Sequence, residues 1–234
     1  MVRAYLFLAV FIPLTFLIAA SAIVWTFLDG SGRAYAFHAR LWARLALRLA
    51  GVRVTLLGAE HLPDGPVIFM SNHQSGFDIL ALLAALPCKF YWIAKKELFD
   101  IPVFGTSMRR GGYIPLDRGD GRKALKSMNN AAEIIKAGKS VVMFPEGTRT
   151  KNGNLLPFKR GGFMLALKAG VPVVPITING SGRVNPAGRI RLYRGNISID
   201  LHPPLMPQTN LPRGEAETQL MEQVRGAISL TLEI

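Results

Sequence analysis

The chain has 234 residues, half of them hydrophobic, and carries a formal net charge of +13 at pH 7. Its single cysteine, Cys88, excludes an internal disulfide and a zinc site built from several thiolates. The charge favours a polyanionic partner, and we expect this partner not to be nucleic acid, because the basic residues are spread along the chain without a helix-turn-helix, zinc-finger or RNA-binding motif.

The N-terminal stretch is the first predicted element. Residues 4–28 contain no charged side chain, and this apolar run is long enough for a helix that crosses a bilayer core. Trp25 near its far end suits the headgroup level. The alternative is a cleaved signal peptide with Ala20-Ser21-Ala22 as its cleavage site. Apolar residues continue past that site, and the preceding region offers only Arg3 besides the amino terminus, so we favour a retained helix.

Residues 33–49 predict a second helix. Arg40, Arg44 and Arg48 share one face and apolar residues dominate another, a pattern typical of a helix in a membrane interface. The alternative is an ordinary amphipathic helix packed on the following domain. We expect residues 1–50 to form a two-helix membrane-anchoring hairpin, whose first helix either spans or re-enters the membrane. The arginines that follow the apolar run predict that the rest of the chain lies on the cytoplasmic side of the inner membrane.

After Gly51, short apolar runs alternate with segments of helical periodicity. We predict an α/β domain over residues 51–234, a mixed sheet flanked by helices, with no further domain boundary. The predicted strands are 52–57, 67–70, 90–93, 141–144, 173–178 and 197–201, and the predicted helices are 79–86, 120–137, 161–169 and 214–232, with Asp120 as an N-terminal cap.

A polar loop directly follows the strand predicted at 67–70. It reads Ser-Asn-His-Gln-Ser-Gly-Phe-Asp over residues 71–78, so that His73 and Asp78 lie five residues apart. A helix beginning within this loop would bring the carboxylate to one imidazole nitrogen and leave the other free to accept a proton. The alternatives are a loop histidine beside a helix-capping aspartate, and a metal site, for which the loop supplies only two ligands.

Three further blocks accompany this loop. They are Gly-Tyr-Ile-Pro-Leu-Asp-Arg at 112–118, Phe-Pro-Glu-Gly-Thr-Arg at 144–149 and Val-Pro-Val-Val-Pro-Ile at 171–176. Together with Asn-His-x-x-x-x-Asp at 72–78, they resemble in order the four motif blocks of the glycerolipid acyltransferases, and most closely the 1-acyl-sn-glycerol-3-phosphate acyltransferase family. The resemblance covers roughly residues 50 to 205.

The resemblance implies that His73 is the catalytic base and that Asp78 orients it, with the acceptor hydroxyl attacking a thioester directly and no acylated enzyme. Asn72 is expected to hold the loop next to the bound substrate. Lys95 either adds positive charge to the acceptor site or is a solvated residue without a role.

The resemblance also assigns the second and third blocks to the glycerol phosphate acceptor. Arg149 offers a planar fork suited to phosphate, and Arg118 is a second candidate, although either could instead form a surface salt bridge. Gly147 would let a backbone N–H approach the ligand, with Thr148 beside it. Glu146 is expected to contribute to substrate positioning, by orienting an arginine or accepting a hydroxyl.

We therefore expect an enzyme that transfers a fatty acyl group from acyl-CoA or acyl-acyl carrier protein to the sn-2 hydroxyl of 1-acyl-sn-glycerol 3-phosphate (lysophosphatidate), forming phosphatidate at a membrane lipid bilayer. No cofactor or metal is expected beyond the thioester co-substrate. The alternatives are another lysolipid acceptor, a hydrolase and a non-catalytic basic membrane-binding protein. The hydrolase is disfavoured because the sequence has no Gly-x-Ser-x-Gly elbow. The choice of donor, the acyl-chain length and the oligomeric state stay open.

Overall fold

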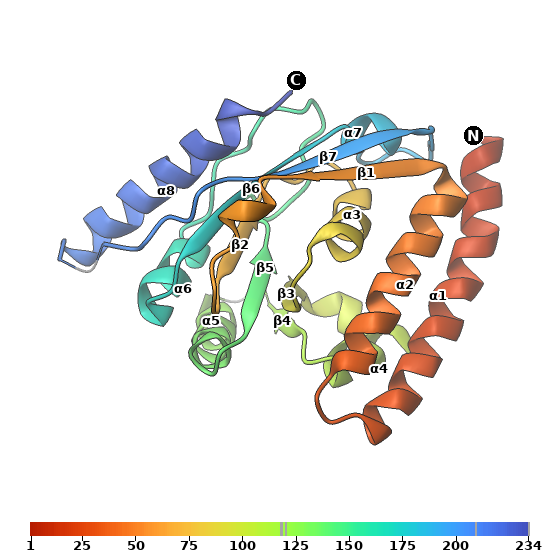
Figure 1. Cartoon of the computed structure of the whole chain (residues 1–234), viewed down its shortest axis with the longest axis horizontal. Coiled ribbons are helices and arrows are strands. Elements are labelled where there is room, and N and C mark those ends of the chain that lie inside the picture. The colour runs from red at the N-terminus through yellow and green to blue at the C-terminus, as the bar shows by residue number, and fades with distance from the viewer. Residues whose placement is uncertain (118, 120, 209, 234) are drawn as a thin grey trace.

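The computed structural model describes residues 1–233 apart from 118, 120 and 209. A seven-stranded sheet with the order β1-β7-β6-β2-β5-β3-β4 forms the centre of the molecule (Figure 1). Neighbouring strands are parallel except β6 and β7, so the predicted mixed sheet is confirmed. The strands are β1 (Val52–Leu57), β2 (Ile68–Ser71), β3 (Phe90–Lys95), β4 (Ile114–Leu116), β5 (Ser140–Met143), β6 (Val173–Asn179) and β7 (Gly195–Leu201).

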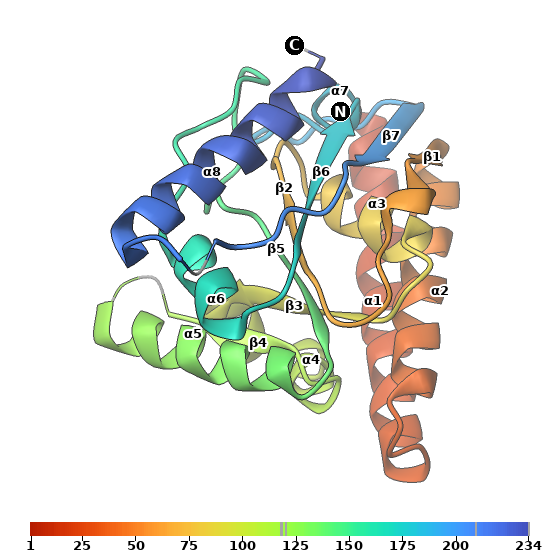
Figure 2. The same cartoon turned by 60° about the vertical axis from the view of Figure 1, so that its left-hand side comes forward.

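Helices cover both faces of the sheet. The helices α1, α2 and α3 lie on one side, and α5, α6 and α8 on the other (Figure 2). The helices are α1 (Val2–Leu28), α2 (Arg33–Ala50), α3 (Phe77–Ala85), α4 (Phe104–Arg110), α5 (Gly121–Lys136), α6 (Gly161–Ala169), α7 (Ser181–Val184) and α8 (Arg213–Leu230), with short 3₁₀ helices η1 (Ala59–His61) and η2 (Lys96–Asp100).

The central strand β2 shows why the sheet is covered twice. All its residues are buried: Phe69 packs into the core with α2 and α3, whereas Ile68 and Met70 pack into the core with α5, α6 and α8. Successive side chains of a strand point to opposite faces, so an uninterrupted apolar run requires apolar partners on both.

The first two helices form an antiparallel hairpin. Thr15 Oγ1 accepts a hydrogen bond from Trp42 Nε1 at 2.9 Å, and Ser21 Oγ lies 3.1 Å from His38 Nε2. The hairpin ends at Gly51, whose φ of 62° is in the left-handed region that favours glycine. Helix α2 packs against α3 through buried small residues, which agrees with the alternative of an amphipathic helix packed on the following domain.

Helix α1 is different, because most of its side chains are exposed although they are apolar. Among the described residues, α1 is the one helix long and apolar enough to cross a membrane by length and composition. It has 27 residues, of which Ala4, Phe7, Ala19 and Ala22 are buried. Its unburied apolar face is therefore available to a partner outside the chain.

Several predicted boundaries shift by one or two residues, and two of these shifts have a clear local cause. Helix α3 begins at Phe77 instead of residue 79, because the Ser75 hydroxyl accepts the Phe77 N–H at 3.2 Å and starts the first turn early. Strand β5 ends at Met143, one residue before the predicted end, because Pro145 follows in a turn. The predicted helix over 120–137 is observed as α5, and its predicted cap, Asp120, lies outside the described residues.

Candidate active site

The strand order brings the predicted site segments to one edge of the sheet. Strands β2, β5, β3 and β4 are adjacent and parallel, so their carboxyl ends lie at the same edge. The 71–78 loop, called the catalytic loop below after the role predicted for His73, follows β2, the 144–149 block follows β5, and Lys95 ends β3. Arg118 comes after β4 in the sequence but lies outside the described residues, so its predicted role stays a prediction.

His73 and Asp78 form the predicted contact. Asp78 Oδ2 accepts a hydrogen bond from His73 Nδ1 at 2.7 Å and further bonds from the backbone N–H groups of Gln74 at 2.8 Å and Ser75 at 2.9 Å. Asp78 is fully buried in the first turn of α3, where a helix N-terminus favours a carboxylate. With Nδ1 occupied, the remaining imidazole nitrogen, Nε2, is the one that can take a proton from a substrate.

The imidazole of His73 is also held from one side by Phe144. The two rings stack with their centroids 3.8 Å apart and an interplanar angle of 8°, and Trp92 stacks on Phe144 in turn with a centroid separation of 5.6 Å. This restricts rotation of the imidazole. Sequence reasoning overlooked Phe144 in this role, although its place directly after β5, the neighbour of β2, is a usable signal.

Glu146 is engaged with the backbone. It is 2% exposed, and its carboxylate accepts the backbone N–H of His73 at 2.7 Å and that of Leu156 at 2.9 Å. Burial raises the pKa of Glu146, and the two backbone hydrogen bonds oppose that rise. Among the described residues its carboxylate contacts no arginine and instead joins the catalytic loop to the segment after β5, while its expected part in substrate positioning stays a prediction.

Asn72 is likewise engaged with the backbone. Its side-chain amide donates to Ile178 O at 2.8 Å, and its Oδ1 accepts the Ile178 N–H at 2.7 Å. Asn72 is buried, so it fixes the catalytic loop to the neighbouring strand β6, as expected of a residue that holds the loop.

Gly147 lies in a tight turn at the cavity. Its N–H donates to Phe144 O at 3.0 Å and closes a turn with Pro145 at the second position, and the approach of a backbone N–H to a ligand at this glycine stays a prediction. Its φ of 71° explains the need for glycine. The turn then presents Thr148 and Arg149 as exposed side chains.

A cavity of about 650 Å³ connects these residues. His73, Gly147, Thr148, Arg149 and Lys95 all contribute to its wall. Arg149 lies beside the catalytic loop, because a Cβ built on Gly76 would be 4.0 Å from its Nη1. Lys95 Nζ is 3.4 Å from the Glu97 carboxylate, an exposed pair that leaves the lysine at the cavity.

The rest of the cavity wall is mainly apolar and comes largely from the hairpin and α4. It includes Ile18, Ala19, Ala22, Ala39, Trp42, Leu83, Ile93, Phe104 and Met108. Tyr35 also lines it, and burial raises the pKa of Tyr35 to about 12, so its hydroxyl is neutral at physiological pH. One cavity therefore combines an imidazole and an arginine with a long apolar surface.

Cys88 lies away from this chemistry. It precedes β3, at the sheet edge opposite to the one that bears His73, and its carbonyl oxygen accepts a hydrogen bond from Arg40 of α2 at 2.7 Å. Burial raises the pKa of the Cys88 thiol, which disfavours the nucleophilic thiolate.

Known proteins match the part of the chain that carries these site residues. A family model described as "Acyltransferase" matches residues 53–179. A chloroplastic 1-acyl-sn-glycerol-3-phosphate acyltransferase of Brassica napus is 40% identical over 192 residues, which are 80% of this chain and 55% of that protein. A 1-acyl-sn-glycerol-3-phosphate acyltransferase of Pseudomonas aeruginosa is 33% identical over 213 residues, covering 86% of this chain and 82% of that protein.

The fold also matches a solved structure. The crystal structure of the 1-acyl-sn-glycerophosphate (LPA) acyltransferase PlsC from Thermotoga maritima superimposes with a TM-score of 0.82 at 27% sequence identity, over 100% of this chain and 98% of that one. The chain spans 54% to 58% of the length of the plant and algal curated relatives.

Proposed function

Because this chain belongs to the acyltransferase family, we propose that it transfers a fatty acyl group from a thioester donor to the sn-2 hydroxyl of 1-acyl-sn-glycerol 3-phosphate, forming phosphatidate. One observation carries the proposal: the imidazole of His73, oriented by Asp78, lines the same cavity as the guanidinium of Arg149. Base and phosphate-binding cation therefore face one substrate volume.

The reaction needs one proton carrier. His73 Nε2 takes the proton of the acceptor hydroxyl as its oxygen attacks the thioester carbonyl carbon. A C–O bond forms and the C–S bond breaks, after which the imidazolium returns its proton to the departing thiolate. Asp78, bonded to Nδ1, holds the ring orientation and stabilises the transient positive charge, and no covalent enzyme intermediate is required.

The cavity accommodates both ends of such a substrate. Arg149 suits the phosphate monoester, because its planar guanidinium donates two parallel hydrogen bonds to phosphate oxygens. The apolar wall from α1, α2 and α4 suits a fatty acyl chain. The cavity volume of about 650 Å³ is within the range of ligand sites. Acyl-CoA and acyl-acyl carrier protein place the same thioester at His73.

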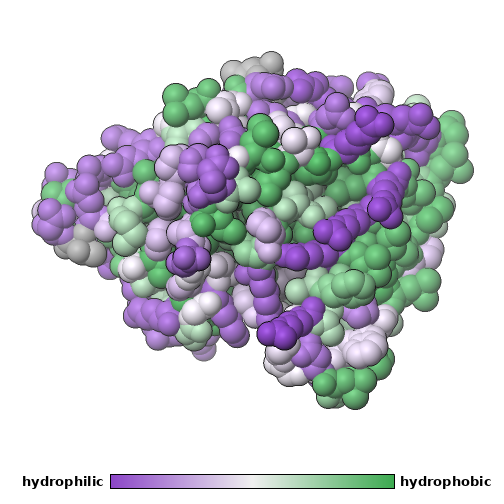
Figure 3. All heavy atoms as spheres, in the orientation of Figure 1, coloured by the Kyte–Doolittle hydropathy of each residue, from purple (hydrophilic) through white to green (hydrophobic). Residues whose placement is uncertain are grey.

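We also propose that the hairpin lies in one leaflet, on the cytoplasmic side of the inner membrane. Both ends of α1 contact the same folded domain: Phe7 packs on Phe77 of α3, with ring centroids 5.8 Å apart, and Arg110 of α4 donates to Thr26 Oγ1 at 2.6 Å. A helix of about 40 Å that crossed the bilayer would carry one end away from the domain. Figure 3 shows the hydrophobic surface that α1 offers instead.

An assay of the purified protein tests the proposed reaction. Lysophosphatidate is supplied with acyl-CoA or with acyl-acyl carrier protein, and phosphatidate is quantified. We expect product with at least one donor, and loss of turnover in His73→Ala with folding and vesicle binding intact. Full activity of His73→Ala would refute the base assignment. A better rate with a phosphate-free lysolipid would favour the alternative acceptor.

A further inference from the structure

A basic loop between α7 and β7 is unused by the proposed reaction. Residues 185–194, which we call the arginine loop, include Arg189, Arg191 and Arg194, all exposed. Ile190 and Tyr193 are 53% and 49% exposed, whereas the intervening Leu192 is buried in the core that contains α2 and α3. Leu192 anchors the loop, and its arginines and two large apolar side chains face outward.

The arginine loop lies against the end of the hairpin. A Cβ built on Gly51, which ends α2, would be 3.2 Å from Arg194 Cγ and 3.1 Å from Arg3 Nη2 of α1. The exposed apolar face of α1 begins in the same turn, with Val2, Tyr5 and Leu6. Figure 1 shows the N-terminus of α1 beside β1, β7 and α7, so the loop extends the exposed surface of the hairpin.

The three arginines of this loop have no acidic partner in the described part of the chain. Among the residues that the structure describes, Arg189, Arg191 and Arg194 form no ion pair, whereas the nearby Arg183 pairs with Glu233 at 2.9 Å. A partner must therefore supply negative charge and also cover Ile190 and Tyr193. A nucleic acid would satisfy the charge but leave the apolar side chains and the adjoining α1 face in water. A bilayer with anionic headgroups satisfies both.

We propose that the arginine loop is a second membrane contact, which binds anionic lipid headgroups through Arg189, Arg191 and Arg194 and inserts Ile190 and Tyr193 at the interface. This proposal rests on the proposed membrane attachment of the hairpin, and not on the acyl-transfer reaction. The loop also touches the catalytic loop, because Ser75 Oγ donates to Asn185 O at 2.9 Å. Its lipid contact thereby sets the orientation of the active site over the membrane.

Vesicle binding of the full chain tests this contact. We compare the wild type with the triple variant Arg189→Gln, Arg191→Gln and Arg194→Gln on phosphatidylcholine vesicles and on vesicles in which one third of the lipid is phosphatidylglycerol. Each arginine at an anionic surface contributes about fivefold to affinity, so we expect the loss of all three to weaken binding to the anionic vesicles about 100-fold. Binding to the neutral vesicles should change by less than about threefold, because only the apolar contacts act there.

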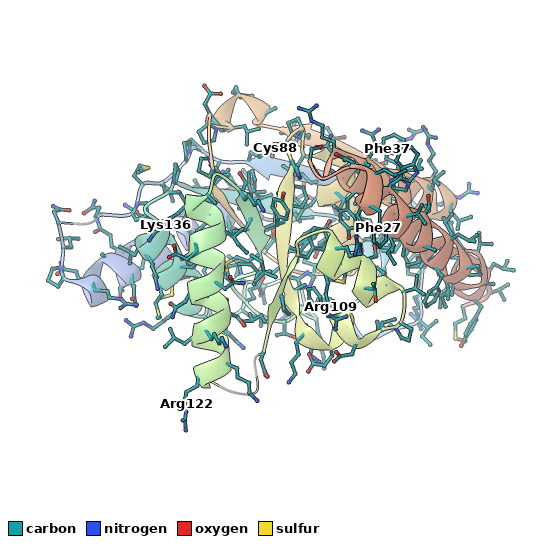
Figure 4. The ribbon with its side chains drawn as sticks, turned by 90° about the horizontal axis from the view of Figure 1, so that it is seen from below. Phe27, Phe37, Cys88, Arg109, Arg122 and Lys136 are labelled. Carbon is teal, nitrogen blue, oxygen red and sulfur yellow. The ribbon has the colours of Figure 1, made fainter. Side chains whose placement is uncertain are left out.

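The matched control removes the same net charge elsewhere. Lys126→Gln, Lys136→Gln and Lys168→Gln lie on the α5 and α6 side of the sheet, where Figure 4 shows Lys136 across the molecule from Phe27 and Phe37. We expect this variant to bind anionic vesicles within about threefold of the wild type, because its lysines lie beyond a Debye length from the membrane. Equal losses in both triple variants, or no loss in the arginine variant, would overturn the proposal.

A second measurement does not depend on the triple variant folding. In a Cys88→Ser background, Ile190→Cys or Lys136→Cys is labelled with an environment-sensitive fluorophore. We expect the emission at position 190 to shift to the blue on anionic vesicles and the emission at position 136 to stay unchanged. An unshifted label at 190 would refute insertion of the loop. Neither measurement needs turnover, so a failure of the proposed reaction is separately recognisable.

Discussion

Replacing Asp78 with Asn tests the centre of the candidate site. The substitution keeps the size of the side chain but removes the charge beside His73. Asp78 Oδ2 accepts three hydrogen bonds, from His73 Nδ1 and from the N–H groups of Gln74 and Ser75. An asparagine can present its single oxygen to the same three donors, so the catalytic loop should keep its conformation while the imidazolium loses its counter-charge.

The expected kinetic effect follows from this geometry. Opposite charges about 4 Å apart interact by about 4 kcal/mol at an effective dielectric constant of about 20. The retained neutral hydrogen bond returns about 1 kcal/mol, which leaves about 3 kcal/mol and corresponds to a fall in kcat of about 10²-fold. KM for both substrates should stay within about threefold, because Asp78 is buried beneath the cavity and does not line it.

Stability should fall as well, by a different route. Asp78 Oδ1 is buried without a hydrogen-bond partner among the described residues. The asparagine amino group would occupy this position and leave buried donors unsatisfied, which costs about 1–3 kcal/mol of unfolding free energy. Asp78→Ala removes all three accepted bonds and should be destabilised further.

The assay follows thiol release from acyl-CoA with lysophosphatidate in detergent micelles, at a temperature well below the unfolding midpoint of each variant. Circular dichroism confirms that Asp78→Asn is folded. A folded variant whose kcat lies within threefold of the wild type would refute the reasoning, since Asp78 would then only support the loop.

Three further changes probe the surroundings. Glu146→Ala removes the acceptor shared by the N–H groups of His73 and Leu156, so we expect about 2–4 kcal/mol lower stability by urea unfolding and reduced kcat, with Glu146→Gln intermediate; wild-type stability of the alanine variant would contradict this. Arg149→Ala should raise the lysophosphatidate KM about 5- to 30-fold with little change in kcat, and Arg149→Lys less, because a lone ammonium lacks the bidentate fork; an unchanged KM would remove Arg149 from the phosphate site. Burial lowers the pKa of His202 below its ordinary 6.5, so its contribution to stability is complete above about pH 6.5 and is lost as the pH falls through the lowered pKa. Urea unfolding at about pH 7.5 and about pH 5 should therefore show a smaller difference in His202→Asn than in the wild type, and equal differences would exclude the histidine as the source.

Most local elements and the His73–Asp78 contact follow from the sequence alone, although β4, α4 and α7 are not among the predicted elements. Apolar periodicity and turn residues act over a few positions, so they predict strands such as 52–57 and helices such as 161–169 at their observed places. The contact is local too, because five residues of loop and first helical turn suffice to bring carboxylate and imidazole together. The order of the four blocks, read as family resemblance, agrees with the acyltransferase match over residues 53–179.

The tertiary structure decided the roles that depend on distant segments. Glu146 lies 73 residues from His73 and reaches it only because β5 pairs with β2, which makes its carboxylate a buried link between two loops. The same pairing stacks Phe144 on the imidazole, and the packing of α2 on α3 closes the apolar cavity with the hairpin. Strand order and helix packing are cooperative properties of the whole chain, so residue spacing alone could not assign these contacts.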